Sequence, residues 1–393
     1  MRKPTPEATP SPLAVFRSLP KAELHLHLDG ALRPATALEL GRERRLPELA
    51  GLDLHAVRRR LEAPLPCRDQ AELLRAFDLP VAILQDAESL ARVARELVLD
   101  LAADGIVYAE IRWAPGLHTR RGLSLRDGIA AVVDGVRAGV AAVADVAAVA
   151  GVAAPPTDTA SAAAADASAS ARRSDGIPPI AVRLIAVAMR SAELEVSERV
   201  ARAAVDRLAD GLTGFDLAGP EAAFPDVRPH APAFAIARSG GLGITVHAAE
   251  WGGADQVRRA LAIDPWRIAH GAPAADDPAL MALLRERDIT LDVCPTSNWQ
   301  AGLVPRLALH PLPRLIAAGV PTSLSTDDPT VSAVTLSEEY RRAHDILGLD
   351  LPTLAALDRQ ALRAAFLQHD ETLRAALQER LETYLQATAG WQA

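Results

Sequence analysis

The chain has 393 residues, of which 49% are hydrophobic, so it is long enough to bury a sizeable core. Its formal net charge of −8 and its short basic runs argue against a nucleic-acid-binding surface, which needs clustered lysine and arginine. Two cysteines, Cys67 and Cys294, are too few for a disulfide framework and favour a reducing cytoplasm, and no apolar stretch reaches the ~18 residues of a membrane-spanning helix.

The chain opens with a Pro-rich segment, residues 1–14, that lacks the apolar core of a secretory signal. We expect a disordered tail there, followed by one catalytic domain over residues 15–393. A low-complexity stretch at 153–177 has almost no large apolar side chains to offset its ordering entropy. We therefore expect a floppy insert at 153–177.

The first expected strand is "AELHLHL", residues 22–28. Side chains alternate between the faces of a strand, so His25 and His27 share one face and the leucines share the other. Asp29 continues the polar face just past the strand. The leucine face predicts a packed layer of helices, and the imidazoles predict a polar site.

Seven further apolar runs follow, and segments with helical periodicity separate them. Strands that alternate with helices pair in parallel, so eight such units predict an α/β protein with a (β/α)8 barrel. The residues after Leu336 supply the eighth helix and extra C-terminal helices. The insert precedes the third strand and is expected on the N-terminal face of the barrel. The eight expected strands are 22–28, 106–115, 180–190, 212–219, 242–250, 266–271, 289–295 and 320–329.

Polar residues with catalytic capability gather at the C-terminal ends of five of these strands, where barrel enzymes place their active sites. His118, after the second strand, is a weaker candidate. The residues at the strand ends are His25, His27, Asp29, Asp216, Gly219, Glu221, His247, Glu250, His270, Asp327 and Asp328.

Four of these residues form a donor set that suits a metal ion: His25, His27, His247 and Asp327. Three imidazoles and one carboxylate are typical of Zn²⁺ with an open position for water, whose pKa the ion lowers towards neutrality. No lysine follows the fourth strand to bridge a second ion, so we expect one Zn²⁺ per chain. Each residue alone is weak evidence, and the four together are far more specific.

The motifs "PKAELHLHLDGAL", "FDLAGPE", "TVHAAEWGG", "IAHG", "VCPTSN" and "SLSTDDP" occur in an order and spacing that resemble the adenosine deaminase family of metal-dependent amidohydrolases. The resemblance implies that the four donors above hold the metal and that His270 orients the attacking water and helps to deprotonate it. It gives Glu250 the role of protonating N1 of a purine. The chemistry agrees, because hydroxide addition at C6 pushes electrons onto N1, where an acid stabilises the intermediate.

The same resemblance implies the substrate contacts. Asp328 would contact N7, the backbone N–H of Gly219 would contact N3, and Asp29 would accept the ribose 5′-hydroxyl. His27 would also lie against the substrate. Residues 69–80 read as a helix between the first two strands, where the family has an apolar lid; ordinary core packing predicts the same pattern. The apolar lid residues would be Leu73, Leu74 and Phe77.

Three positions depart from the family pattern at the rim of the expected site. Ala249 stands where the family usually has glycine, and its methyl group would be strained if the backbone needs unusual dihedrals. Pro220 removes a backbone donor next to Gly219. Ser325 replaces a common asparagine. These changes affect the expected specificity more than the expected activity.

We expect hydrolytic deamination of adenosine or 2′-deoxyadenosine in the cytoplasm, with a small-molecule purine nucleoside as the partner and neither nucleic acid nor membrane. The alternative keeps the chemistry on another 6-aminopurine, such as aminodeoxyfutalosine, adenine or an N6-modified nucleoside. Asp29 distinguishes nucleosides from nucleotides, because a carboxylate accepts a hydrogen bond from a hydroxyl group and repels a phosphate. A non-catalytic purine-binding barrel remains a third hypothesis, whereas a cytidine-deaminase-type site is excluded by the missing P-C-x-x-C motif. The oligomeric state stays open.

Overall fold

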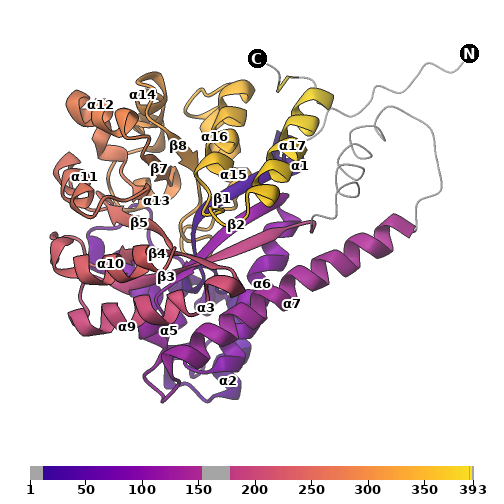
Figure 1. The fold of residues 1–393 in the computed structure, drawn as a ribbon. Coiled ribbons are helices and arrows are strands. Elements are labelled where there is room, and N and C mark those ends of the chain that lie inside the picture. Colours follow the sequence, from indigo (N-terminus) through magenta and orange to yellow (C-terminus); the bar gives the residue numbers. More distant parts are fainter. Residues whose placement is uncertain (1–11, 153–177, 389, 392–393) are drawn as a thin grey trace, which may run out of the picture.

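The computed structural model describes residues 12–152, 178–388 and 390–391. Eight parallel strands form one sheet in sequence order, and helices surround it (Figure 1). The backbone of Asp327, beyond the last strand, pairs with the first strand and brings the two edges together. The α/β prediction of a (β/α)8 barrel is confirmed. The strands are β1 (Lys21–His27), β2 (Ile106–Trp113), β3 (Ala181–Met189), β4 (Leu212–Ala218), β5 (Gly243–Ala248), β6 (Arg267–His270), β7 (Thr290–Val293) and β8 (Thr322–Leu324).

The helices cover the outer face of the barrel, as the leucine face of β1 predicts. Leu24, Leu26 and Leu28 are fully buried. The long helix α7 projects beyond the barrel in Figure 1. The helices are α1 (Pro12–Ser18), α2 (Pro34–Glu43), α3 (Leu54–Leu61), α4 (Gln70–Leu74), α5 (Asp78–Ile83), α6 (Ala87–Ala103), α7 (Leu125–Val152), α9 (Leu194–Val205), α10 (Ala231–Ser239), α11 (Ala254–Ala260), α12 (Pro278–Glu286), α13 (Pro295–Gln300), α14 (Leu312–Ala317), α15 (Leu336–Asp345), α16 (Leu351–Ala364) and α17 (Glu371–Ala387).

Two expected boundaries differ from the structure. Helix α1 begins at Pro12, inside the segment 1–14 that was expected to be a tail, because proline is well suited to the first turn of a helix and Phe16 packs into the core. The expected lid helix at 69–80 is instead α4, a 3₁₀ turn over Arg75–Phe77, and α5. Pro80 has no N–H to donate to the carbonyl four residues earlier, which explains the break. The expected insert at 153–177 lies outside the described residues.

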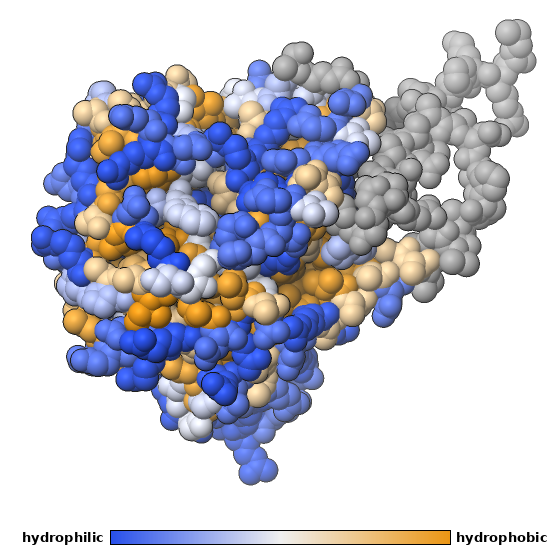
Figure 2. Space-filling view, in the orientation of Figure 1, coloured by the Kyte–Doolittle hydropathy of each residue, from blue (hydrophilic) through white to orange (hydrophobic). Residues whose placement is uncertain are grey.

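Hydrophobic residues on the face shown in Figure 2 lie between hydrophilic ones and gather along α7 where it leaves the barrel. Within the described part of the chain, none of the helices combines the length and the apolar character needed to cross a membrane.

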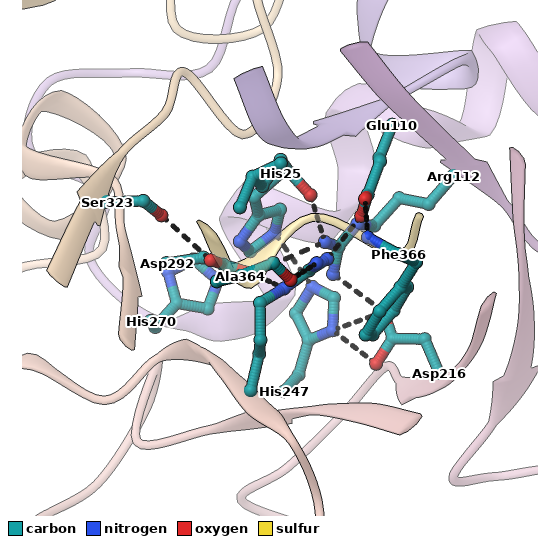
Figure 3. Close-up of polar contacts among 12 residues, drawn as sticks. His25, Glu110, Arg112, Asp216, His247, His270, Asp292, Ser323, Ala364 and Phe366 are labelled. Atoms are coloured by element: carbon teal, nitrogen blue, oxygen red, sulfur yellow. Dashed lines mark hydrogen bonds and ion pairs between the residues drawn. The ribbon is translucent and has the colours of Figure 1, made fainter. Parts of the chain in front are cut away.

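The interior of the barrel is charged rather than purely apolar (Figure 3). Arg267 pairs with Glu110 at 2.5 Å and with Asp292 at 3.1 Å, and all three side chains are fully buried. Arg112 pairs with Asp216 at 2.9 Å and donates to the carbonyl of Leu24. This network was missed by the sequence analysis, although single arginines inside apolar strand runs could have signalled it.

Phe366 closes the N-terminal end of the barrel beneath this network. Its backbone N–H donates to Glu110, and the guanidinium of Arg267 lies 3.8 Å from its ring centroid. Gly214 and Gly243 make room for the ring, since a Cβ at either position would lie within 2.6 Å of a Phe366 side-chain atom. The segment after α16 is therefore part of the barrel floor.

Replacing Arg267 by methionine would leave Glu110 and Asp292 buried without their shared cation. We expect the free energy of unfolding to fall by about 3–5 kcal/mol, as when one partner of a buried pair is removed. The control is Arg359→Met, whose pair with Glu382 is 44% and 42% exposed and should cost less than about 1 kcal/mol. Urea denaturation measures both. Equal losses would show that the buried network contributes no more than a surface pair.

Candidate active site

Four side chains from β1, β5 and the segment after β8 converge at the C-terminal mouth of the barrel. The Nε2 atom of His247 lies 3.1 Å from Nε2 of His25 and 3.1 Å from Nε2 of His27. Asp327 Oδ1 lies 3.0 Å from His25 Nε2 and 3.4 Å from His27 Nε2. Burial lowers the pKa of His25 and His247, so both rings are neutral and their nitrogens can serve as ligands.

These spacings fit a metal ion. A tetrahedral Zn²⁺ with bonds of about 2.0–2.1 Å holds its ligand atoms about 3.3–3.4 Å apart. Burial alone would raise the pKa of Asp327, but the histidines beside it, His270 and His25, bring it well below its ordinary value, so it is ionised. The potential ligand atoms of His25, His247, His270 and Asp327 all lie within 4.8 Å of one another. Those of His27, Asp327 and Asp328 form a second such group, so Asp327 belongs to both.

Groups behind the donors orient them. His247 Nδ1 lies 3.0 Å from Asp216, which Arg112 holds from the other side, so Nε2 of His247 must face the site. Burial would raise the pKa of Asp216, but His247 and Arg112 lower it instead. Arg190 donates to the carbonyl of His247 at 2.7 Å.

Further partners of the donors come from the segment after β7. Cys294 Sγ lies 3.6 Å from His25 Nδ1, and Ser297 Oγ donates to Asp327 Oδ2 at 2.6 Å. From the sequence, Asp216 was identified only as a polar strand end, and no role was predicted for Arg112, Arg190, Cys294 or Ser297. The last two lie within the motif "VCPTSN".

Glu250 lies close to His270 with its side chain 14% exposed. Its Oε2 is 4.0 Å from His270 Nε2, whose ring is fully buried. Burial raises the pKa of Glu250 well above its ordinary value, and the charges of Asp327 and Glu221 raise it further. Glu250 is thus held as a neutral acid.

Glu221 has a role that the sequence analysis did not assign. Its two carboxylate oxygens accept the backbone N–H groups of Ala249 at 2.8 Å and Trp251 at 3.0 Å. The carboxylate therefore holds both ends of the turn that carries Glu250. Arg190 Nη2 lies 3.9 Å from Glu221 and adds a cation to the clamp.

Three residues at the site adopt a left-handed backbone that side chains rarely tolerate. The φ angles are +58° at Ala249, +69° at His270 and +69° at Asp327. Strain of this kind concentrates at functional sites. The strain anticipated from alanine at position 249 is therefore present.

Four of the seven residues expected to bind substrate line a cavity of about 940 Å³, and His27 and Asp328 are not among them. Asp29, Gly219, Leu74 and Phe77 line it. Leu73 does not, and it packs instead in a small apolar cluster with Cys67, Ala76 and Val331. His118 is also outside the site, with its Nδ1 2.8 Å from the carbonyl of Leu84.

Two buried carboxylates at this mouth have an unsatisfied oxygen. Asp29 and Asp328 are each 5% exposed, and their Oδ1 atoms have no hydrogen-bond partner among the described residues. Burial raises the pKa of Asp328 well above its ordinary value, and the charge of Asp327 adds to this. Buried polar atoms are rarely left unpaired, so both oxygens indicate a polar ligand.

The family model for adenosine deaminase matches residues 20–384. The chain belongs to the adenosine deaminase family. The adenosine deaminase of Enterococcus faecalis is 32% identical over 355 residues, which cover 90% of this chain and 94% of that protein. That of Mycolicibacterium vanbaalenii is 35% identical over 377 residues, 93% of this chain and 95% of the relative.

Solved structures of deaminases share the fold. An adenine deaminase from Arthrobacter aurescens has a TM-score of 0.75 and 25% identity, covering 94% of this chain and 99% of its own. The N6-methyl-AMP deaminase of Arabidopsis thaliana has a TM-score of 0.74 and 28% identity, covering 94% and 98%. The activity of this family member is hydrolytic deamination of a 6-aminopurine, and the hypothesis of a non-catalytic barrel is set aside.

Replacing Ala249 by glycine should stabilise the protein. The change relieves about 1–2 kcal/mol of left-handed strain against about 0.4–1 kcal/mol of added freedom in the unfolded chain. We expect the free energy of unfolding to rise by roughly 0.5–1 kcal/mol. The control, Ala201→Gly inside α9, should lower it by about 1 kcal/mol or more. If both variants lose stability equally in urea denaturation, the backbone at Ala249 is unstrained.

Proposed function

We propose that the chain converts adenosine and 2′-deoxyadenosine to the 6-oxo nucleosides and ammonia, with one Zn²⁺ held by His25, His27, His247 and Asp327. This proposal is supported by one observation, the clustering of three kinds of group at the mouth of the barrel. They are the four proposed ligand atoms, the neutral acid Glu250, and the unpaired oxygens of Asp29 and Asp328. When bound, the metal acts as a Lewis acid that makes water nucleophilic near neutral pH.

The side chains and backbone of this chain transfer the proton and bind the purine ring. Glu250 delivers its proton to N1 while hydroxide adds to C6, so the charge that develops on the ring is neutralised. Neutral Asp328 donates to N7, which is an acceptor and would be repelled by an ionised carboxylate. The backbone N–H of Gly219 faces N3, and His270 lies beside the attacking water.

Asp29 determines which purine fits. Its unpaired oxygen accepts a 5′-hydroxyl, and Leu74 and Phe77 line the same cavity as this carboxylate. Of the two neighbours named above, one acts on adenine and the other on N6-methyl-AMP. Related Arabidopsis structures contain IMP or GMP. Asp29 favours a nucleoside over a free base, which has no 5′-hydroxyl, and over a nucleotide, which would place a phosphate against a carboxylate.

Replacing Glu250 by glutamine should abolish turnover and leave the metal bound, because an amide cannot protonate N1. We expect kcat to fall by about 10²–10⁴-fold, the usual contribution of general acid catalysis. Loss of the adenine absorbance band measures turnover, and metal analysis should give about one equivalent per chain for both proteins. Glu286→Gln, at an exposed position, is the control. A variant at position 250 that keeps more than a few per cent of kcat would remove Glu250 from the mechanism.

The ranking of substrates tests the assignment of Asp29. We expect kcat/KM to be highest for adenosine and 2′-deoxyadenosine and at least about tenfold lower for adenine, because an unpaired buried acceptor costs about 1–3 kcal/mol. AMP should react negligibly. Asp29→Asn should narrow the gap between adenosine and AMP. If adenine, AMP or aminodeoxyfutalosine exceeds adenosine tenfold, the substrate assignment is wrong although the deaminase chemistry stands.

A further inference from the structure

Three buried side chains behind the active site form a chain of hydrogen bonds that starts at a backbone N–H. The N–H of Leu312 donates to His310 Nδ1 over 3.1 Å. Nε2 of His310 lies 3.1 Å from Asn298 Oδ1, and Nδ2 of Asn298 lies 3.2 Å from His270 Nδ1. Asn298 and His270 are fully buried and His310 is 4% exposed, so these hydrogen bonds are shielded from bulk solvent.

The direction of every bond follows from the first one. A backbone N–H only donates, so Nδ1 of His310 is an acceptor. Burial lowers the pKa of His310 to about 3, so its ring is neutral and its single N–H is at Nε2. That N–H donates to the Asn298 carbonyl oxygen, and the amide NH₂ then points at His270 Nδ1.

The last bond sets the tautomer of His270. Because Nδ1 receives a hydrogen bond from an NH₂ group, it cannot carry a hydrogen, and the neutral ring holds its hydrogen on Nε2. Turning the Asn298 amide over would place its NH₂ against the Nε2–H of His310, leaving two buried donors facing each other. The backbone of Leu312 thus determines the tautomer through two side chains.

Nε2 of His270 points into the site and has no hydrogen-bond partner among the described residues. It lies 3.7 Å from Asp327 Oδ2 and 4.0 Å from Glu250 Oε2. We propose that His310 and Asn298 are positioning residues that present His270 to the attacking water as a hydrogen-bond donor, a proposal that rests on the proposed function.

This assignment changes the part that His270 plays. An Nε2–H stabilises negative charge on the attacking oxygen, and the same atom cannot accept the proton of the water. The family resemblance implied that His270 helps to deprotonate the water. With its hydrogen on Nε2, His270 acts as a hydrogen-bond donor to the attacking oxygen and not as the base.

The tautomer can be measured without substrate or metal. In the metal-free chain labelled with ¹⁵N-histidine, the signals of His270 are identified as those that disappear in His270→Asn. The two ring nitrogens of His270 should show a hydrogen-bearing Nε2 and a lone-pair Nδ1. A wild-type ring with its hydrogen on Nδ1 overturns the proposal, whatever the variants do.

Variants separate positioning from simple support of the fold. In Asn298→Asp the new carboxylate accepts from Nδ1–H, so the hydrogen should appear on Nδ1 and kcat should fall at least about tenfold with little change in KM. His310→Leu should give a mixture of tautomers and a loss of kcat. His310→Gln, which can accept from Leu312 and donate to Asn298, should restore the tautomer and most of kcat.

The outcomes also separate this proposal from the proposed function. If the tautomer is as stated but the wild-type protein deaminates no nucleoside, the proposed function fails and the hydrogen-bond chain stands. If the wild-type protein is an adenosine deaminase and His310→Leu keeps both the tautomer and full kcat, the positioning role fails alone.

Discussion

Two main-chain hydrogen bonds across the seam of the barrel set the geometry on which the site depends. The N–H of His27 donates to the carbonyl of Asp327 at 2.8 Å, and the N–H of Asp327 donates to the carbonyl of His25 at 3.0 Å. Three of the four proposed metal ligands are therefore aligned by backbone pairing. The left-handed φ of Asp327 turns its side chain onto the histidine face, so the strain at that residue follows from closing the barrel while aiming a carboxylate inward.

The fourth ligand depends on the charged interior. Asp216 contacts His247 above and Arg112 beside it, and Arg112 reaches the carbonyl of Leu24 in the first strand. An apolar barrel core could fill the same volume but could not dictate which nitrogen of a histidine faces the mouth. The chain thus retains buried ion pairs, a costly form of packing, where they orient the reactive groups.

Much of this arrangement could be predicted from the sequence because it follows local patterns. Alternation in "AELHLHL" places His25 and His27 on one face, and eight separated apolar runs predict the barrel. Contacts between residues distant in sequence could not be predicted in this way. The clamp from Glu221 to the turn at Ala249 and the pairing of Arg267 with Glu110 depend on three-dimensional proximity that no periodicity encodes. The break in the expected helix at 69–80 depends on one residue, Pro80. The helical pattern around Pro80 led to the prediction of an unbroken helix.

The position of Phe366 in the barrel floor has a consequence for folding during translation. During translation all eight strands leave the ribosome before residue 366, yet Glu110 and Arg267 acquire their last partners only when the ring and its N–H arrive. A barrel that forms during synthesis therefore leaves Glu110 and Arg267 without these partners at its open N-terminal end until synthesis is almost finished. A premature stop codon between Asp327 and Phe366 would release a product that carries every proposed metal ligand but lacks the residue that closes the barrel floor, which makes it a natural target for cellular proteolysis.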